Sequence, residues 1–210
     1  MRYRLAIFDF DGTLADTTPF HARAFQEVFA PFGIAVDYRA IAGMRTAEVV
    51  SALLARAGVV LPAEQADSLC RAKQRLARTL ISRELSPLPG VADFLHFARR
   101  SYRLAIYSSG SRATVEAALE RLGFSGWFDP LLCAEDVREA KPHPEGFLRV
   151  LELTRVPAAA ALVFEDSRSG LLSAGSAGIK AVCVDPSSAA AGIHTVPWPA
   201  WQAVTKGAPA

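Results

Sequence analysis

The sequence is poor in cysteine and lacks any long uninterrupted apolar run. Its three cysteines, Cys70, Cys133 and Cys183, form no close pair. This excludes a zinc site or a redox dithiol built on paired cysteines and favours a reducing, cytoplasmic setting. No apolar stretch approaches the roughly 18 residues that cross a bilayer. Residues 1–10 include an acidic residue where a secretory signal would stay apolar, so we expect neither a membrane span nor secretion.

The chain also lacks an excess of charge of one sign. Lys plus Arg number 23 and Asp plus Glu 21, which gives a net charge of +2. A protein that holds nucleic acid mainly through phosphate contacts needs a larger positive excess, so we expect no nucleic-acid partner. Hydrophobic residues make up 51% of the 210 residues, which is enough for one domain, or for one domain with a substantial insertion. The charge permits a monomer or a small homo-oligomer.

Short apolar runs alternate with amphipathic helical patterns along most of the chain. Apolar residues recur at the 3, 4 spacing of a buried helix face in 91–98 and again in 115–122. This alternation predicts an α/β fold, with a Rossmann-like doubly wound parallel sheet covered by helices on both faces. The five expected strands are Arg4–Phe10, Arg103–Tyr107, Pro130–Cys133, Ala161–Phe164 and Lys180–Val184.

The alternation stops between Ala15 and about Pro87, where apolar stripes at helical spacing indicate a small helical bundle. We therefore expect an α/β core at 1–14 and 88–210, with a helical cap at 15–87 inserted after the first strand. Such an insertion belongs above the carboxyl end of the strand, where open α/β sheets bind ligands, and would act as a lid. The tail from Ser187 to Ala210 is rich in Ala, Ser and Pro, and we expect it to be loosely ordered.

The first expected strand ends in two acidic residues, Asp9 and Asp11, followed by Gly12, which allows a sharp turn. Two carboxylates at the end of a buried strand repel one another and lose hydration, so they need a cation or a shared proton. A magnesium ion would satisfy that need, and a solvated acidic turn is the simpler alternative. A calcium-binding EF-hand loop is excluded, because Leu14 and Phe20 occupy the positions where it requires Gly and Glu.

Hydroxyl groups follow the second expected strand. Ser108, Ser109, Gly110 and Ser111 precede a helix that begins near Arg112. Hydroxyls and backbone N–H groups at the start of a helix form an anion site. The alternative is that Ser111 only caps the helix.

Two further segments carry polar residues at strand ends. Lys141 is one of only four lysines and is followed by Pro142 and Pro144 on a stiff segment; it is either a partner for carboxylates or phosphate or an exposed loop lysine. Glu165 and Asp166 end the fourth strand, where acids also favour the dipole of the following helix. If the first, second and fourth strands are neighbours, these polar ends converge on one patch.

With these endings in this order, the sequence resembles the haloacid dehalogenase (HAD) superfamily of phosphotransferases. The similarity is greatest to the subgroup with a helical cap after the first strand, which includes β-phosphoglucomutase and phosphoglycolate phosphatase. It covers roughly residues 4 to 186. The segment Asp9 to Thr13, preceded by LAIF, carries the resemblance together with AKPHPEGF and VFEDSRSGLLSAGSAGI.

The resemblance implies a role for each of these groups. Asp9 would attack the phosphorus and form an aspartyl phosphate, while Asp11 would protonate the leaving oxygen and then activate water. Ser108, with the amides of Ser109 and Gly110, would hold the phosphoryl oxygens. The implied substrate is a small phosphorylated metabolite, a sugar or polyol phosphate or phosphoglycolate.

The implied cofactor is Mg²⁺. Its ligands would be Asp9, the main-chain carbonyl of Asp11, and Asp166, with Glu165 bound directly or in the outer shell. Lys141 would neutralise charge between Asp9 and the phosphate.

The resemblance also separates relatives and points to cap residues. Asp11 argues against the dehalogenases, which lack the second aspartate. A phosphonoacetaldehyde hydrolase uses an early cap lysine, and none precedes Lys73. His21 matches a cap histidine of the β-phosphoglucomutase group, with a surface histidine as the alternative. Lys73 interrupts an apolar stripe, so its ammonium either extends to solvent or faces the substrate. Arg45 is a third candidate for substrate contact.

A magnesium-dependent phosphomonoesterase is thus the expected function, and three alternatives stay open. A mutase of the β-phosphoglucomutase type is the nearest, although Ala42 stands where that family has a basic residue. A signalling receiver domain has its phosphorylated aspartate on the third strand and no helical insertion, which argues against it. A catalytically silent binding protein of the HAD type is disfavoured because every catalytic position is filled.

Overall fold

The computed structural model describes residues 3–41, 44 and 46–184. The chain divides into two compact units, one made of residues 1–16 and 86–210 and the other of Thr17–Leu85. Arg45 and the Ser187–Ala210 tail, for which the sequence suggested a role or a state, lie outside the described residues. None of the helices in the described segments is both long and apolar enough to span a membrane.

The first unit is built on a sheet of five parallel strands in the order β3-β2-β1-β4-β5. Four of them lie within an expected apolar run, because runs that are apolar on both faces suit strands covered on both sides. The other, β4, extends one residue beyond its run, to Glu165. The expected α/β fold with a doubly wound parallel sheet is confirmed. The strands are β1 (Leu5–Phe8), β2 (Arg103–Tyr107), β3 (Leu131–Leu132), β4 (Ala161–Glu165) and β5 (Lys180–Cys183).

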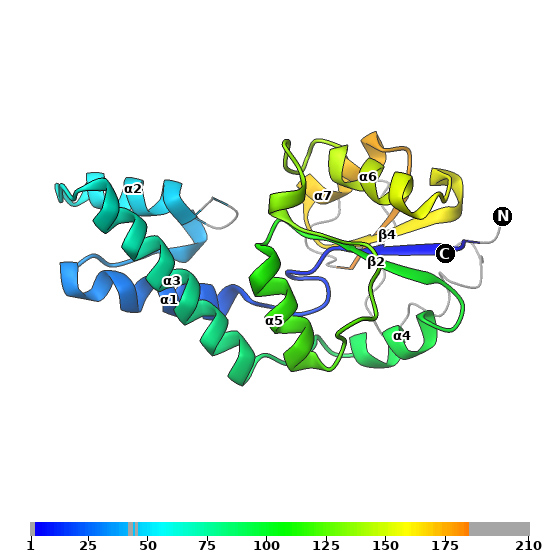
Figure 1. The fold of residues 1–210 in the computed structure, drawn as a ribbon, viewed down its shortest axis with the longest axis horizontal. Coiled ribbons are helices and arrows are strands. Elements are labelled where there is room, and N and C mark those ends of the chain that lie inside the picture. Colours follow the sequence, from blue (N-terminus) through cyan, green and yellow to red (C-terminus); the bar gives the residue numbers. More distant parts are fainter. Residues whose placement is uncertain (1–2, 42–43, 45, 185–210) are drawn as a thin grey trace. The chain divides into compact units, whose positions relative to one another are not determined.

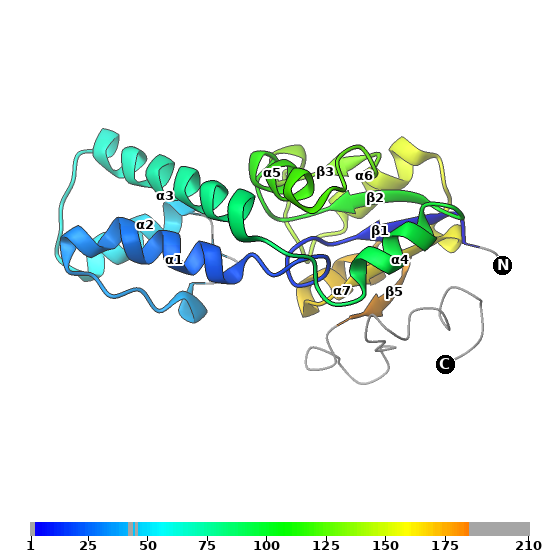
Figure 2. The same ribbon diagram turned by 90° about the horizontal axis from the view of Figure 1, so that it is seen from below.

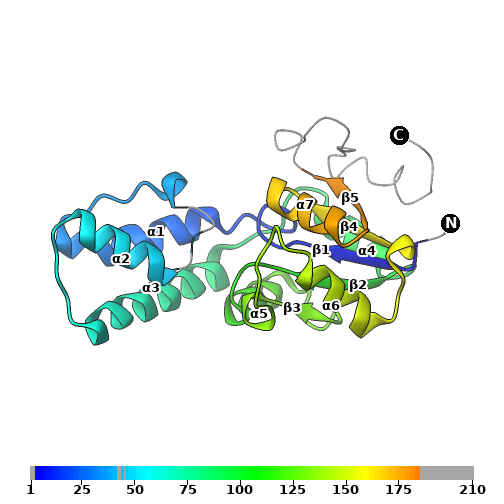
Figure 3. The ribbon, with the colours of Figure 1, turned by 90° about the horizontal axis from the view of Figure 1, so that it is seen from above.

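Helices cover both faces of this sheet. Figure 1 shows α6 and α7 on one face and α4 and α5 on the other, and the view in Figure 3 places α6 and α7 in front of the strands. The connections between strands also contain short 3-10 turns at Ala134–Asp136 and Ala158–Ala160. The helices are α4 (Val91–Ala98), α5 (Arg112–Leu122), α6 (Glu145–Thr154) and α7 (Arg168–Ser176).

The register of the central strands brings their carboxyl ends to one edge. Phe8 of β1 is level with Ile106 of β2 and with Phe164 of β4. Phe8 and Phe164 stack with ring centroids 5.0 Å apart, and Phe94 of α4 packs on both rings. Because these strands are aligned, the residues that follow them, including Asp9 and Ser108, emerge at the same edge of the sheet.

The second unit contains the helices α1 (Thr18–Phe29), α2 (Thr46–Arg56) and α3 (Ala63–Glu84), with 3-10 turns at Ala30–Phe32 and Tyr38–Ala40. Figure 2 shows α1 and α3 side by side. The apolar faces of α1 and α2 form a separate core that includes Phe25, Phe29, Val49, Val50, Leu53 and Leu54. This unit has a core of its own, as expected of a helical bundle.

Candidate active site

The chain turns sharply where β1 ends. Asp9 is almost completely buried. Its amide donates to the Phe164 carbonyl at 3.0 Å, which continues the pairing with β4. The Gly12 amide then donates to the Ala15 carbonyl at 2.9 Å, and Gly12 has a φ of 81°, in the region that favours glycine. This turn fixes Asp9 and Asp11 at the edge of the sheet.

Asp166, at the end of β4, lies against that turn. A Cβ atom at Gly12 would stand 2.1 Å from Asp166 Oδ2, so glycine is also needed here to admit the carboxylate. Thr13 is fully buried, and its hydroxyl donates to Asp166 Oδ1 at 3.1 Å. The carboxylate of Asp166 is therefore held beside the Asp9–Thr13 loop although 153 residues separate it from Thr13.

Lys141 joins the first and fourth strands through its side chain. Its ammonium Nζ donates to Asp9 Oδ1 at 2.6 Å and to Glu165 Oε1 at 2.7 Å. The lysine side chain is 4% exposed, so the ammonium is shielded from solvent. Of the two hypotheses for Lys141, the structure supports pairing with carboxylates and not an exposed loop lysine.

Glu165 is fixed from several sides. It is fully buried, and its Oε2 accepts hydrogen bonds from the Ser167 amide at 2.7 Å and the Ser167 hydroxyl at 2.8 Å. The Ser167 hydroxyl also accepts from the Gly170 amide at 3.1 Å and so caps α7. A Cβ at Gly170 would collide with Glu165. Both carboxylate oxygens of Glu165 are thus engaged by the protein itself.

The loop after β2 lies beside Asp11. Ser108 is fully buried, and its hydroxyl accepts from the Gly110 amide at 2.9 Å, whereas Ser109 is exposed. A Cβ at Gly110 would lie 3.5 Å from Asp11 Oδ2, which places that carboxylate next to the loop. Ser111 occupies the N-cap of α5, but its hydroxyl pairs with the Thr114 hydroxyl at 2.9 Å and makes no capping bond.

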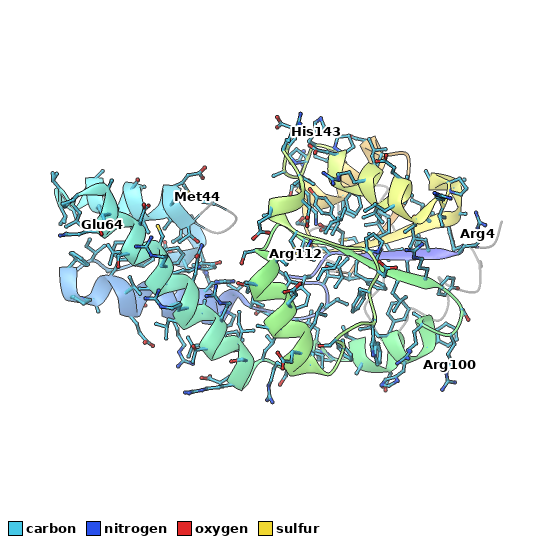
Figure 4. All side chains as sticks on the ribbon, viewed as in Figure 1. Arg4, Met44, Glu64, Arg100, Arg112 and His143 are labelled. Atoms are coloured by element: carbon cyan, nitrogen blue, oxygen red, sulfur yellow. The ribbon has the colours of Figure 1, made fainter. Side chains whose placement is uncertain are left out.

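Three residues, which we call the clamp, tie the start of α5 to the segment after β3: Arg112, Glu135 and Asp136. The amide of Arg112, at the beginning of α5 (Figure 4), donates to both Glu135 carboxylate oxygens at 3.2 and 3.0 Å. Its guanidinium donates to Asp136 Oδ2 at 2.5 Å and to the Leu131 carbonyl at 3.0 Å. The clamp therefore fixes the point where the Ser108 loop enters its helix.

The segment that carries Lys141 is anchored on the other side. His143 follows Lys141 on the loop before α6 (Figure 4), and its carbonyl accepts from the Ser173 hydroxyl at 2.7 Å. Glu145 accepts from the amides of Arg138 and Glu139. The Ser173 bond holds the loop against α7, and the bonds to Glu145, which lower the pKa of that residue, tie the loop to the start of α6.

Burial and crowding of like charges dominate the electrostatics of this edge. Burial raises the pKa of Asp9 well above its usual value, against the Lys141 charge, and Glu165 and Asp166 raise it further. Burial raises the pKa of Asp166 to about 6, and Glu165 adds to the effect. For Lys141 burial acts to lower the pKa, but Asp9 and Glu165 outweigh it and raise the value above the usual one. One ammonium therefore faces an excess of carboxylates.

The chain resembles known proteins along most of its length. A model of the haloacid dehalogenase-like hydrolases matches residues 6–184. The chain belongs to this family. The fructose-1-phosphate phosphatase YqaB of Escherichia coli is 32% identical over 187 residues, which cover 87% of this chain and 97% of the relative. A phosphorylated carbohydrates phosphatase of Thermotoga maritima is 33% identical over 183 residues, 84% of this chain and 82% of the relative.

A solved structure of the same fold holds phosphate. CbbY from Rhodobacter sphaeroides, crystallised in complex with phosphate, superimposes with a TM-score of 0.79 at 29% identity, over 91% of this chain and 92% of that one. The resemblance to the HAD superfamily drawn from the sequence is thereby confirmed. The expectation of an enzyme is confirmed as well, since the chain is a phosphatase of the haloacid dehalogenase-like hydrolase family.

The donor atoms of this hydrolase fit a magnesium ion. Asp9 begins the turn and the Asp166 carboxylate lies against it, so acids from two stretches of chain meet there. The pKa values of both acids are raised, because the charge of Lys141 alone does not offset their burial and the repulsion from neighbouring carboxylates. In the described ranges no three His, Cys, Asp or Glu side chains form a metal-binding group. Mg²⁺ does not require one, because it is commonly bound by one or two carboxylates and keeps several waters.

The two described cap candidates meet inside the helical unit. Lys73 of α3 is 4% exposed, and its Nζ lies 2.9 Å from Nδ1 of His21 in α1 and 4.3 Å from the centre of the Phe25 ring. The ammonium does not extend to solvent, which was one of the two hypotheses for it. Arg45 lies outside the described residues, so no contact is assigned to it.

Several residues that shape this edge were missed by the sequence reasoning. Thr13 donates to Asp166, Ser167 donates to Glu165, and Gly170 leaves room for the Glu165 carboxylate. The Tyr107 ring lies beside Lys141 and against Gly146. Ser167 lies three residues before Gly170, whose amide it caps, and a serine at this spacing is a recognisable N-cap signal in a sequence. Thr13, Gly146 and Gly170 lie within the segments that carry the family resemblance, but no local pattern shows which distant residues they or Tyr107 contact.

Proposed function

We propose that this protein is a magnesium-dependent phosphomonoester hydrolase that acts on a small phosphorylated metabolite, a sugar or polyol phosphate. The observation that carries the proposal is the ammonium of Lys141, which is bonded to Asp9 and Glu165 at the strand edge where Ser108 and Asp166 also emerge. The substrates named for the two phosphatases described above support the choice of phosphorylated sugars.

In the first half of the reaction Asp9 is the nucleophile. One of its carboxylate oxygens attacks the phosphorus, the bond from phosphorus to the ester oxygen breaks, and an aspartyl phosphate forms. Asp11 gives its proton to the departing alkoxide, which leaves as the alcohol. Its position two residues after Asp9, beside the Ser108 loop, suits this role.

In the second half Asp11, now ionised, takes a proton from water as the water oxygen attacks the phosphorus. The bond to Asp9 breaks and inorganic phosphate is released. Asp9 is restored as a carboxylate and Asp11 as a carboxylic acid, so protons and charge balance over the cycle.

Charge on the phosphoryl group is met by fixed donors. Lys141 lies on Asp9 and would contact the phosphoryl oxygens, and Ser108 with the Ser109 and Gly110 amides would bind the others. The Gly110 amide would have to exchange its bond to Ser108 for one to phosphate. A magnesium ion held by Asp9, Asp166 and the Asp11 carbonyl would neutralise negative charge as the phosphoryl group transfers.

Glu165 has a supporting role in this proposal. Because Lys141 and Ser167 already engage both of its oxygens, we place it outside the direct ligands of the metal. It would hold Lys141 in place and orient the water molecules around the ion.

The proposal is tested by measuring release of inorganic phosphate from a panel of sugar and polyol phosphates, with and without Mg²⁺. Asp9→Asn should lower turnover by at least about 10³-fold, because the amide is not a nucleophile. Asp93→Asn, at an exposed position on α4, is the matched control and should leave turnover unchanged. Undiminished release by Asp9→Asn would remove the proposed nucleophile.

A second variant separates the two aspartates. Asp11→Asn should slow both half-reactions while leaving the nucleophile in place. Mass spectrometry after rapid mixing with a good leaving-group substrate should find the phosphoryl group on Asp9. Finding it on another residue would refute the assignment.

We further propose that substrate choice depends on the helical unit and that the protein works in the cytoplasm. The buried Lys73 and its neighbour His21 support the first part, since a desolvated cation is suited to recognise an anionic or hydroxyl-rich group. The free state of Cys70, Cys133 and Cys183 supports the second part.

A further inference from the structure

Tyr107 ends β2, directly before Ser108, and its ring lies under the helices of one face. The residue is 1% exposed and belongs to the core cluster that also contains Phe147 and Val150 of α6. Its ring meets that of Phe147 edge to face, with centroids 5.0 Å apart and planes at 87°. Such a pair is a rigid wall, because each ring restricts the rotation of the other.

This wall faces the ammonium of Lys141. Nζ lies over the Tyr107 ring, 4.9 Å from its centroid, and 5.6 Å from the centroid of Phe147. Both distances fall within the range of about 6 Å in which a cation is attracted to an aromatic face. The same nitrogen is bonded to Asp9 and Glu165, so carboxylates and rings surround the ammonium in a site closed to solvent.

The ring of Tyr107 reaches this position only because residue 146 is glycine. A Cβ at Gly146 would stand 2.1 Å from the Tyr107 ring atom Cζ and 2.4 Å from Cε1 and Cε2. A side chain at this position would therefore push the ring aside or lift the start of α6. The segment Lys141–Phe147 thus supplies the cation, Lys141, and the Phe147 ring, while Gly146 leaves the space that the Tyr107 ring occupies.

The hydroxyl of Tyr107 does not explain its place in the core. Within the described part of the chain it is the single buried side-chain nitrogen or oxygen without a hydrogen-bond partner. An unpaired buried hydroxyl lowers stability. Packing alone would therefore be served at least as well by phenylalanine, and the contribution of the residue to the site resides in the ring.

We propose that Tyr107 is a positioning residue that acts through Lys141. Its ring, braced by Phe147 and admitted by Gly146, keeps Nζ within hydrogen-bond reach of Asp9 and Glu165 together. Without the ring, the lysine side chain gains alternative rotamers and loses the attraction to the aromatic face. The ammonium then no longer stays on the nucleophile. This inference rests on the proposed phosphatase function.

The kinetic test compares two replacements of Tyr107. Tyr107→Phe keeps the ring and should retain kcat within about twofold, with equal or higher thermal stability. Tyr107→Leu removes the ring and should lower kcat by about 10- to 100-fold, because a misplacement of about 1 Å has effects of this size. KM should change little, because the displaced charge acts mainly in the transition state. Gly146→Ala, which displaces the ring without removing it, should reproduce the loss of kcat.

A second measurement does not depend on activity. The chain has four lysines, so labelling lysine with ¹³C gives a simple spectrum, and Lys141→Met identifies the signal of Lys141. Ring current should shift the Lys141 ε-methylene protons in the wild type and in Tyr107→Phe, and the shift should diminish in Tyr107→Leu and Gly146→Ala.

Several results would overturn the inference. One is a Tyr107→Leu variant that melts at a lower temperature but keeps full kcat well below its melting point, as a purely structural role requires. An equal loss of kcat in Tyr107→Phe would assign the effect to the hydroxyl. A Lys141 signal that stays unchanged in Tyr107→Leu and in Gly146→Ala would show that the ring does not contact Lys141. If the wild type hydrolyses no phosphate ester, the proposed function fails, while the lysine spectrum still decides whether the ring positions Lys141.

Discussion

His21 illustrates how burial, together with one charged neighbour, keeps a side chain neutral. Burial, with the added effect of the Lys73 ammonium, lowers the pKa of His21 to about 3, from an ordinary value of 6.5. Since Lys73 donates protons only, His21 Nδ1 is the acceptor of their contact, and the imidazole is neutral with its proton on Nε2. Above pH 6.5 both the folded and the unfolded chain hold this histidine neutral.

The stability of the fold should therefore fall on acidification partly because of His21. Below about pH 6.5 His21 binds a proton in the unfolded chain, whereas in the folded chain it stays neutral down to about pH 3. At about 1.4 kcal/mol per pH unit, this costs about 2 kcal/mol at pH 5. His21→Gln keeps an acceptor for Lys73 and does not titrate. Urea unfolding at pH 7.5 and pH 5 should show a smaller loss for His21→Gln, and parallel losses in both proteins would contradict the prediction.

At this scale the sequence predicts residue types better than it predicts contacts. Asp9, Lys141 and Asp166 stand out because polar groups end apolar runs, and the structure brings them to one edge. Lys73 stands out because it interrupts an apolar stripe, yet its pairing with His21 depends on how two helices pack. Tyr107 reads as an ordinary strand residue, since its contact with Lys141 requires the loop before α6 to fold back over it.

Among the elements, the clamp of Arg112, Glu135 and Asp136 sets the position of the Ser108 loop. Asp136 accepts from both the Arg112 guanidinium and the Cys133 amide, at 2.5 and 2.8 Å. Asp136→Ala should lower the free energy of unfolding by about 1–3 kcal/mol, because a partly buried amide loses its acceptor. It should also lower kcat/KM, because the loop that we propose to bind phosphate is no longer fixed.

Glu139→Gln is the matched control for this prediction, since it removes a carboxylate charge at an exposed loop position near Asp136. It should leave both quantities unchanged. Denaturant titration and steady-state kinetics on the two variants provide the measurement. A kcat/KM that stays at the wild-type value in Asp136→Ala, despite lower stability, would show that the clamp does not act on the site.

Strands and helices were predictable, whereas the bonds between loops were not. β2 covers the same residues as its expected run, Arg103–Tyr107, because continuous apolar sequence suits a strand buried on both faces. β1 is shorter than expected, because the chain turns from Asp9 onward under the control of Gly12. The clamp joins segments 24 residues apart, and no local pattern announces such a pairing.

For the whole molecule, ligand binding should appear as added thermal stability. Orthovanadate imitates the five-coordinate phosphorus of the transition state, and with Mg²⁺ it should bind the folded site but not the unfolded chain. At a ligand concentration of about 100 times Kd the gain is about 2.7 kcal/mol, which corresponds to a rise in Tm of several degrees for a chain of this size.

Calorimetry or dye-based melting, with and without the two ligands, measures this rise. Chelation of Mg²⁺ by EDTA should abolish it, as should Asp9→Asn, whereas Asp93→Asn should retain it. A rise of equal size in the absence of Mg²⁺ would contradict the magnesium dependence.

The separation of Asp9, Lys141 and Glu165 along the chain has a consequence for biosynthesis. Lys141, the cation that pairs with the proposed nucleophile Asp9, is synthesised 132 residues after it. Glu165 and Asp166 follow later still. On the mechanism proposed above, a nascent or truncated polypeptide that stops before β4 should therefore not hydrolyse phosphate esters.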